Sequence, residues 1–223
     1  MEEYKRILAV DDHEMTTLGY KYILEGASFD GYEVMVDTCK SFDEATRRIK
    51  ESEKLYRYDI FLFDIQLFSP ETKDPRSGED LGKLARKVAP NTKLVYMSSF
   101  SDAFRIKSIL QATDPDGYMV KSEIDEESLI HMVKKVISDP PYYTASALSV
   151  IRKTMANNDL IDDTDKKILY HIATGVRTKD ISPLLSLSLT TIETRKRKIK
   201  TLFGIDDGND FSLIERAREK GFI

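Results

Sequence analysis

The sequence predicts a doubly wound α/β domain, with a five-stranded parallel sheet, followed by a small all-α helix-turn-helix domain. Three observations support this fold class. Short apolar runs alternate with helical patterns through the first 138 residues, which is typical of repeated βα units. From about residue 163 the pattern is helical only. Pro140 and Pro141 separate the two parts, and a helix must end before them because proline lacks an amide donor and restricts the preceding residue.

Each expected strand is a short apolar run bounded by polar residues, as in strands that are buried on both faces. We expect strands at residues 6–10, 32–37, 59–64, 93–97 and 117–120. Helices are expected at 14–24, 41–51, 78–88, 102–110 and 126–137, and the last of these carries one apolar stripe at helical spacing.

The second domain is expected to contain helices at 163–174, 178–185, 190–203 and 211–220. Gly175 and Gly204 follow two of them and provide stop signals. The middle two are closely joined and the second is basic, which is the arrangement of a helix-turn-helix. We therefore divide the chain into a first domain over 1–138, a partly helical linker over 139–160 and a helix-turn-helix domain over 161–223.

The net charge of −4 is unevenly distributed. Residues 160–223 contain twelve Lys or Arg and ten Asp or Glu, a charge of +2, so the remainder carries −6. No apolar run approaches the roughly 20 residues that span a bilayer, and the lone Cys39 fits a reducing cytosol. We thus expect a cytoplasmic protein without membrane contact. A locally basic run indicates a nucleic-acid partner, and here it consists of Arg195, Lys196, Arg197, Lys198 and Lys200.

Three carboxylates and one ammonium group follow three of the expected strands. Asp11 and Asp12 come after the first strand, Asp64 ends the third and Lys121 follows the fifth. In an open α/β sheet the working site lies at the carboxyl ends of the strands, so these groups are expected in one pocket. Clustered carboxylates must take up a proton or bind a cation, and hard oxygen ligands suit Mg²⁺.

Such a pocket suits phosphoryl transfer. A Mg²⁺ ion beside Asp64 would neutralise an incoming phosphoryl group while the Asp64 carboxylate attacks phosphorus. Ser98 and Ser99, just past the fourth expected strand, offer hydroxyl and amide groups to the phosphoryl oxygens.

These residues, in this order and spacing, resemble the receiver domain of two-component response regulators over about residues 4–138. The resemblance implies that Asp64 receives phosphate from a sensor histidine kinase. It further implies that Asp11 and Asp12, with Asp64 and the backbone carbonyl of Gln66, hold Mg²⁺. Ser98 and Lys121 would engage the phosphoryl group, and Tyr118 would be an aromatic rotamer switch. The matching segments are Asp11-Asp12-His13, Asp64, Met97-Ser98-Ser99 and Gly117-Tyr118-Met119-Val120-Lys121.

One segment departs from the receiver pattern. The family usually has Pro four residues after the phosphoacceptor, where this chain has Phe68, and Gly about eight residues after it. Here the matching glycine is Gly78, fourteen residues on. The stretch from Phe68 to Ser77 is therefore expected to be an insertion beside the site, either as surface decoration or with a role in kinase choice or phosphate lifetime.

Residues 160–223 resemble the LuxR-type output domain, which together with a receiver defines the NarL/FixJ class of response regulators. The resemblance lies in Ile168-Leu169-x-x-Ile172-Ala173-x-Gly175, Lys179-Asp180-Ile181 and Thr191-Ile192-Glu193-Thr194. Basic side chains of such a helix neutralise DNA phosphates, while residues near its start read base edges. The expected DNA contacts are Lys179, Thr190, Thr191, Thr194, Arg195, Arg197 and Lys198.

Two positions of the basic helix differ from the output-domain pattern. The family often has Lys or Arg at the position of Glu193 and an apolar residue at that of Lys196. Glu193 could accept a hydrogen bond from a cytosine amino group or weaken phosphate contact. Lys196 leaves a gap in the apolar stripe formed by Ile192 and Ile199 with the residues after them.

We therefore expect a DNA-binding transcriptional regulator that phosphorylation of Asp64 switches, with a phosphorylation-dependent homodimer, and not an enzyme beyond slow autodephosphorylation. An atypical regulator that acts through protein contact without specific DNA binding stays open because of Glu193 and Lys196. A phosphatase of the haloacid-dehalogenase type would need a second Asp where this chain has Gln66. A nucleotide-binding enzyme would need a glycine-rich phosphate motif, which the sequence lacks.

Overall fold

The computed structural model of the chain describes residues 3–52, 55–67, 76–99, 103–156, 161–205, 209–220 and 222–223. The chain divides into two compact units, which we describe separately. The first unit holds the sheet with most of its helices and continues to Ala147. The second holds the C-terminal helices together with residues 103–108. None of the helices in the described ranges combines the length and the apolar character that crossing a bilayer requires.

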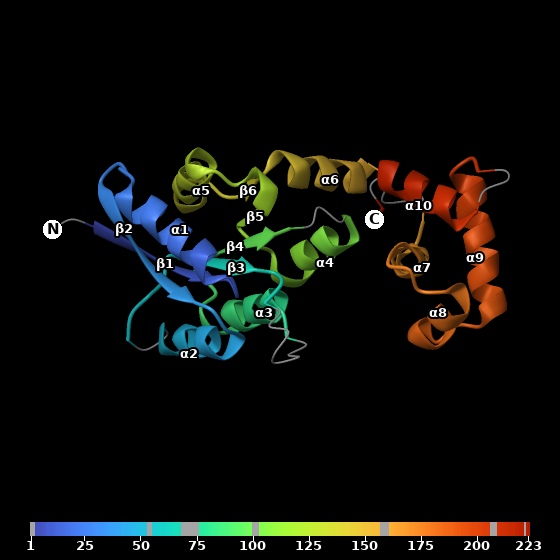
Figure 1. Ribbon diagram of the computed structural model, residues 1–223, viewed down its shortest axis with the longest axis horizontal. Coiled ribbons are helices and arrows are strands. Elements are labelled where there is room, and N and C mark those ends of the chain that lie inside the picture. Colours follow the sequence, from blue (N-terminus) through green and yellow to red (C-terminus); the bar gives the residue numbers. More distant parts are fainter. Residues whose placement is uncertain are drawn as a thin grey trace. The chain divides into compact units, whose positions relative to one another are not determined.

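The first unit is a parallel sheet with the strand order β2-β1-β3-β4-β5-β6 (Figure 1). Its strands are β1 (Glu3–Val10), β2 (Tyr32–Cys39), β3 (Ile60–Asp64), β4 (Lys93–Ser98), β5 (Gly117–Val120) and β6 (Tyr142–Tyr143). The intervening helices are α1 (Glu14–Gly26), α2 (Phe42–Ser52), α3 (Gly78–Val88), α4 (Ala103–Thr113) and α5 (Glu126–Ser138), with a short 3₁₀ turn η1 (Lys121–Glu123) after β5. The five strands expected from the sequence are all present.

The sixth strand, β6, was not expected. Its amide at Tyr142 donates to the carbonyl oxygen of Asp116 at 3.0 Å, and Thr144 donates to the carbonyl oxygen of Tyr118 at 3.2 Å. Two residues are too few for a periodic pattern to be recognised, and Pro140 and Pro141 just before them indicated only that a helix ends. The stretch that we took for a linker thus begins with a strand that extends the sheet by one position.

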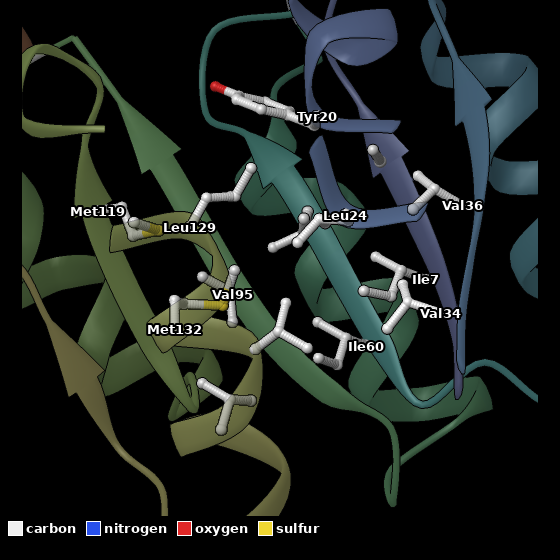
Figure 2. Packing of buried hydrophobic residues seen from close by; sticks show 14 of the residues in the cluster. Ile7, Tyr20, Leu24, Val34, Val36, Ile60, Val95, Met119, Leu129 and Met132 are labelled. Atoms are coloured by element: carbon white, nitrogen blue, oxygen red, sulfur yellow. The ribbon is translucent and has the colours of Figure 1, made fainter. Parts of the chain in front are cut away.

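Alternating strand residues build two apolar layers on the two faces of the sheet. On one face, Ile7, Ile60 and Val95 pack with Leu24 of α1 and Met132 of α5 in a continuous buried cluster (Figure 2). Helices α2 and α3 lie on the other face, where Phe61 stacks on Phe63 with the ring centroids 5.3 Å apart (Figure 1). Because every central strand is covered on both sides, only the ends of the strands remain available for polar chemistry.

The second unit is helical only. Its helices are α7 (Asp163–Ala173), α8 (Thr178–Leu185), α9 (Leu189–Leu202) and α10 (Asp210–Glu219), and α6 (Ala145–Ala156) runs from the first unit into the second. Ile168, Ile181, Ile192 and Leu213, one from each of α7 to α10, form its buried core. Helices α8 and α9 pack directly against each other, as expected of a helix-turn-helix.

Most of the insertion expected from Phe68 to Ser77 lies outside the described residues. Its last two residues are described. The Arg76 guanidinium donates to Asp43 Oδ1 at 2.8 Å and lies 4.3 Å from the ring centroid of Phe42, so it contacts the first turn of α2. The amide of Ser77 donates a hydrogen bond to Asp80 Oδ2 at 3.1 Å, where α3 begins.

Candidate functional site

Lys121 joins the acidic groups at the carboxyl edge of the sheet. Its Nζ donates to Asp11 Oδ2 at 2.6 Å and to Asp64 Oδ2 at 2.8 Å. Asp11 directly follows β1 and Asp64 ends β3, the neighbouring strand, while Lys121 follows β5. The parallel order of the strands thus brings together three groups that are far apart in the sequence.

The carboxylates of this site are buried. Asp11 is fully buried, Asp64 nearly so, and the Lys121 side chain is largely covered. Burial raises the pKa of Asp64, and the Lys121 ammonium only partly opposes that shift. Burial by itself lowers the pKa of Lys121, but its hydrogen bonds to Asp11 and Asp64 raise that pKa overall. The Lys121 ammonium is therefore held in its charged form beside Asp64, whose ionised form burial disfavours. A second cation at this edge would stabilise the ionised form of Asp64.

Asp12 and His13 extend the acidic edge toward solvent. His13 Nδ1 lies 3.2 Å from Asp11 Oδ1 and 2.8 Å from Asp12 Oδ1, and the negative charge of Asp12 raises the pKa of His13. Asp12 Oδ1 is buried and faces the ring nitrogen of His13, and ligand atoms of Asp11, Asp12 and His13 all lie within 4.8 Å of one another. Carboxylate oxygens gathered in this way suit an ion that binds through oxygen. Gln66 is exposed, and its backbone amide donates a hydrogen bond to Asp64 Oδ1 at 3.2 Å.

The other residues expected at this site lie on the two strands beyond β3. Ser98 ends β4, one position after Met97, which is the register partner of Asp64. Ser98 is buried and Ser99 is exposed. Tyr118 of β5 is fully buried and pairs in register with Tyr96 of β4.

Gly78 holds α3 against the backbone of Asp64. Its amide donates to the carbonyl oxygen of Ile65 at 3.0 Å. A Cβ atom at this position would lie 1.9 Å from the Asp64 carbonyl oxygen. The close approach explains in physical terms why glycine stands at the position that we matched to the glycine of the receiver pattern.

In the second unit, most of the expected DNA contacts lie on the surface. Lys179, Arg197 and Lys198 are exposed, and no ion pair joins their side chains to any residue of the described ranges. Thr190 and Thr194 are exposed as well. Thr191 is partly buried, and its amide donates to Ser188 Oγ at 3.0 Å, which caps the start of α9.

Arg195 and Lys196 differ from the rest of the basic run. Arg195 Nη1 donates to Asp162 Oδ2 at 2.7 Å and to Asp165 Oδ1 at 2.8 Å, at the start of α7. Lys196 is buried and donates to Thr178 and Asp210. Sequence reasoning missed both sets of partners. The spacing Asp162-x-x-Asp165 is a capping-box signal and could have located the start of α7, but not its contact with Arg195.

Comparison with known proteins finds relatives that are similar to this chain over nearly its whole length. No family model matches it. The oxygen regulatory protein NreC of Staphylococcus aureus is 26% identical over 98% of this chain and 99% of its own length. Among solved structures, RcsB from Salmonella enterica serovar Typhimurium, bound to the promoter P1flhDC in the presence of the phosphomimetic BeF3−, matches with a TM-score of 0.63. That match has 17% identity and covers 95% of this chain and 97% of RcsB.

A second structure gives the same fold. A LuxR-family two-component response regulator from Aurantimonas sp. matches with a TM-score of 0.56 and 19% identity, over 69% of this chain and 99% of its own. The fold and the acidic edge thus define a receiver-like sheet joined to a helix-turn-helix unit, and the NreC alignment runs through both parts. The chain is thus similar over nearly its whole length to NreC, and it shares the fold of two solved response regulators, RcsB and the LuxR-family protein.

Proposed function

We propose that this protein is a DNA-binding transcriptional regulator that phosphorylation of Asp64 switches. The observation that carries the proposal is the bridge from Lys121 Nζ to both Asp11 and Asp64 at the carboxyl edge of the sheet. This bridge places the buried Asp64 carboxylate next to the fixed positive charge of Lys121. A nucleophilic carboxylate can accept a phosphoryl group there, and the positive charge would stabilise the phosphoryl oxygens.

In the proposed reaction, an oxygen of the Asp64 carboxylate attacks the phosphorus of a phosphohistidine on a sensor kinase. The P–N bond breaks, the histidine nitrogen leaves, and an acyl phosphate forms on Asp64. Lys121 and Ser98, with Ser99, would contact the phosphoryl oxygens. The buried Tyr118 side chain would change its rotamer when Asp64 is phosphorylated. Later attack of water on phosphorus would restore the carboxylate and release inorganic phosphate.

Mg²⁺ fits the same edge. Asp11 and Asp12, together with Asp64 and the carbonyl oxygen of Gln66, would hold it, and the close grouping of the Asp11 and Asp12 carboxylate oxygens supports this. The ion would neutralise charge on the phosphoryl group. Receiver domains typically depend on Mg²⁺.

The second unit is proposed to bind double-stranded DNA through α9. Exposed Arg197 and Lys198, with Lys179 of α8, would contact phosphates, and the threonines near the start of α9, Thr190, Thr191 and Thr194, would face the groove. RcsB is seen as dimers bound to DNA. We propose a receiver over residues 1–138, a linker over 139–160 and a helix-turn-helix domain over 161–223, acting in the cytoplasm as a phosphorylation-dependent homodimer.

Labelling with a small phosphoryl donor such as radioactive acetyl phosphate, with Mg²⁺ present, tests the first half of this function. The wild type should take up label and Asp64→Asn should not. Asp30→Asn, which changes an exposed aspartate in the turn before β2, is the matched control and should be labelled like the wild type. Equal labelling of the wild type and Asp64→Asn would exclude Asp64 as the acceptor.

Retention of a DNA duplex tests the second half. Binding to duplex DNA that weakens with added salt is expected for a regulator that contacts phosphates. Absence of retention at every salt concentration would favour the atypical regulator that acts by protein contact, to which the exposed Glu193 on α9 points.

A further inference from the structure

Lys196 is a buried charge in the apolar stripe of α9. The stripe consists of Ile192, Lys196 and Ile199, which face the core of the second unit, and Lys196 is only 6% exposed. An ammonium group in such a place is costly unless it is paired and hydrogen-bonded. Its partners therefore decide what this position does.

The partners come from the neighbouring helices. Lys196 Nζ donates to Thr178 Oγ1 at 2.9 Å and to Asp210 Oδ2 at 3.0 Å. Thr178 is the first residue of α8, and Asp210 is the first residue of α10. Glu193 Oε1, one turn back on α9, lies 3.6 Å from the same nitrogen. One ammonium group thus connects α9 to the starts of two other helices.

Most of the basic run faces such internal carboxylates. Lys200 Nζ lies 3.6 Å from Asp210 Oδ1, and Arg195 contacts both Asp162 and Asp165 of the α7 start. Arg197 and Lys198 differ, because they are exposed and have no ion-pair partner among the described residues. Only part of the formal charge of this helix is thus available to an external phosphate.

We propose that Lys196 is a positioning residue: with Asp210 and Thr178 it sets the orientation of α9 against α8 and α10, and it does not contact DNA. The inference rests on the proposed DNA binding of this unit. Hydrogen bonds fix a distance and a direction, whereas an apolar side chain at this position would allow α9 to shift or rotate within the core. A single buried polar group that selects one packing arrangement is a known use of such residues. Arg195 is left out of the phosphate contacts for the same geometric reason.

Asp210→Asn gives the sharpest test, measured as affinity of the full-length protein for a random-sequence DNA duplex over a range of salt. The substitution removes a negative charge from a DNA-binding unit. If Lys196 were a phosphate contact, its release from Asp210 would raise the affinity and steepen the salt dependence. A positioning role predicts an affinity loss of about tenfold with the slope of log K against log salt unchanged, since no phosphate contact is lost.

Glu219→Gln is the matched control. Glu219 lies at the other end of α10 in a surface pair with Arg216, and its replacement also removes one negative charge. Its affinity should equal or slightly exceed that of the wild type. A gain in affinity by Asp210→Asn like that of Glu219→Gln would overturn the proposal.

Lys196→Met is a second variant that distinguishes a positioning role of Lys196 from a direct phosphate contact, through the salt dependence of DNA affinity. Its salt slope should match that of the wild type, whereas Arg197→Ala should reduce the slope by about one unit. A loss of one unit in Lys196→Met would overturn the proposal. Circular dichroism of both variants checks that they are folded.

Hydrogen exchange of backbone amides measures the packing of α8 and α9 independently of DNA binding. In Asp210→Asn, amides of α8 and α9 should exchange faster than in the wild type, while those of the β-sheet should not change. Unchanged exchange in α8 and α9 would overturn the positioning role of Lys196 even if the protein binds DNA. If the wild type retains no duplex at any salt, the proposed function fails, and faster exchange would still support the connection between the helices.

Discussion

At the scale of single residues, Gly78 shows how closely α3 packs against the site. The missing side chain lets the helix start rest on the carbonyl group of Asp64. Because this contact is with backbone, which cannot rotate away as a side chain can, the neighbouring segment has little freedom to adjust. The position of the Asp64 carboxylate is therefore coupled to the placement of α3.

We predict that Gly78→Ala moves the start of α3 and destabilises the first unit by about 1–3 kcal/mol, the usual cost of overpacking. Labelling by acetyl phosphate should fall in parallel because Asp64 is displaced. Thermal unfolding and labelling of the variant measure both effects. Gly26→Ala is the control, since a Cβ atom there meets nothing within 4 Å. Equal stability of Gly78→Ala and the wild type would contradict the close approach.

A second prediction concerns Asp116, which receives hydrogen bonds from Arg86 at 2.9 Å, Lys93 at 3.1 Å and the amide of Leu94 at 3.0 Å. Burial alone would raise the pKa of Asp116, but these donors lower it overall. Its native pKa thus lies below the value of about 3.9 in an unfolded chain. The stabilising contribution is complete above that value and is lost as the pH falls through the native pKa.

Urea unfolding of the wild type and Asp116→Asn between pH 7 and pH 3 checks this. The variant should be less stable at pH 7, by about 1.5–3 kcal/mol for loss of charged hydrogen bonds, and the difference should shrink toward pH 3. A difference that stays constant over that range would contradict the lowered pKa.

At the scale of elements, the segment around Lys121 is tied to the start of α6. Thr144 Oγ1 accepts a hydrogen bond from the Val120 amide at 3.1 Å, and the Glu123 carboxylate accepts one from the Ser146 amide at 3.2 Å. The Ser146 hydroxyl also donates to Glu123, whose pKa this hydrogen bond lowers. These contacts involve residues on both sides of Lys121 in the sequence. A displacement of the Lys121 backbone would therefore strain the hydrogen bonds to the first turn of α6.

We predict that Thr144→Val, which keeps the side-chain shape, destabilises the first unit by about 1–3 kcal/mol because the buried Val120 amide loses its acceptor. Hydrogen exchange at Val120 and over the first turn of α6 should become faster. Ser138→Ala, at the exposed end of α5, is the control and should leave both measurements unchanged. Slow exchange at Val120 in Thr144→Val would show that the hydroxyl is not its acceptor.

The sequence was informative where a pattern is long or local, and uninformative where partners are distant. Period and composition were enough to predict the five strands β1 to β5 and the carboxyl-edge cluster of Asp11, Asp64 and Lys121. The strand β6 was missed because two residues carry no period. The partners of Lys196 lie 14 and 18 residues away in the sequence, at the starts of other helices, so no local spacing rule could identify them.

At the scale of the whole molecule, the proposed switch is one of association. Mass measurement in solution, by light scattering, compares the protein alone with the protein in beryllofluoride and Mg²⁺, which imitate the phosphorylated state. We predict that the wild type doubles its mass under these conditions. Asp64→Asn, which lacks the acceptor carboxylate, should keep its mass. A wild type whose mass does not change would exclude phosphorylation-dependent dimerisation.

The short strand β6 has a consequence beyond the topology. Without it, the outer backbone of β5 would be an open sheet edge, and such edges readily pair with strands of other molecules. Tyr142 and Tyr143 occupy that edge, in register with Gly117 and Tyr118. The same few residues lead directly into α6, so a displacement of the first turn of α6 that carried β6 along would expose the backbone of β5.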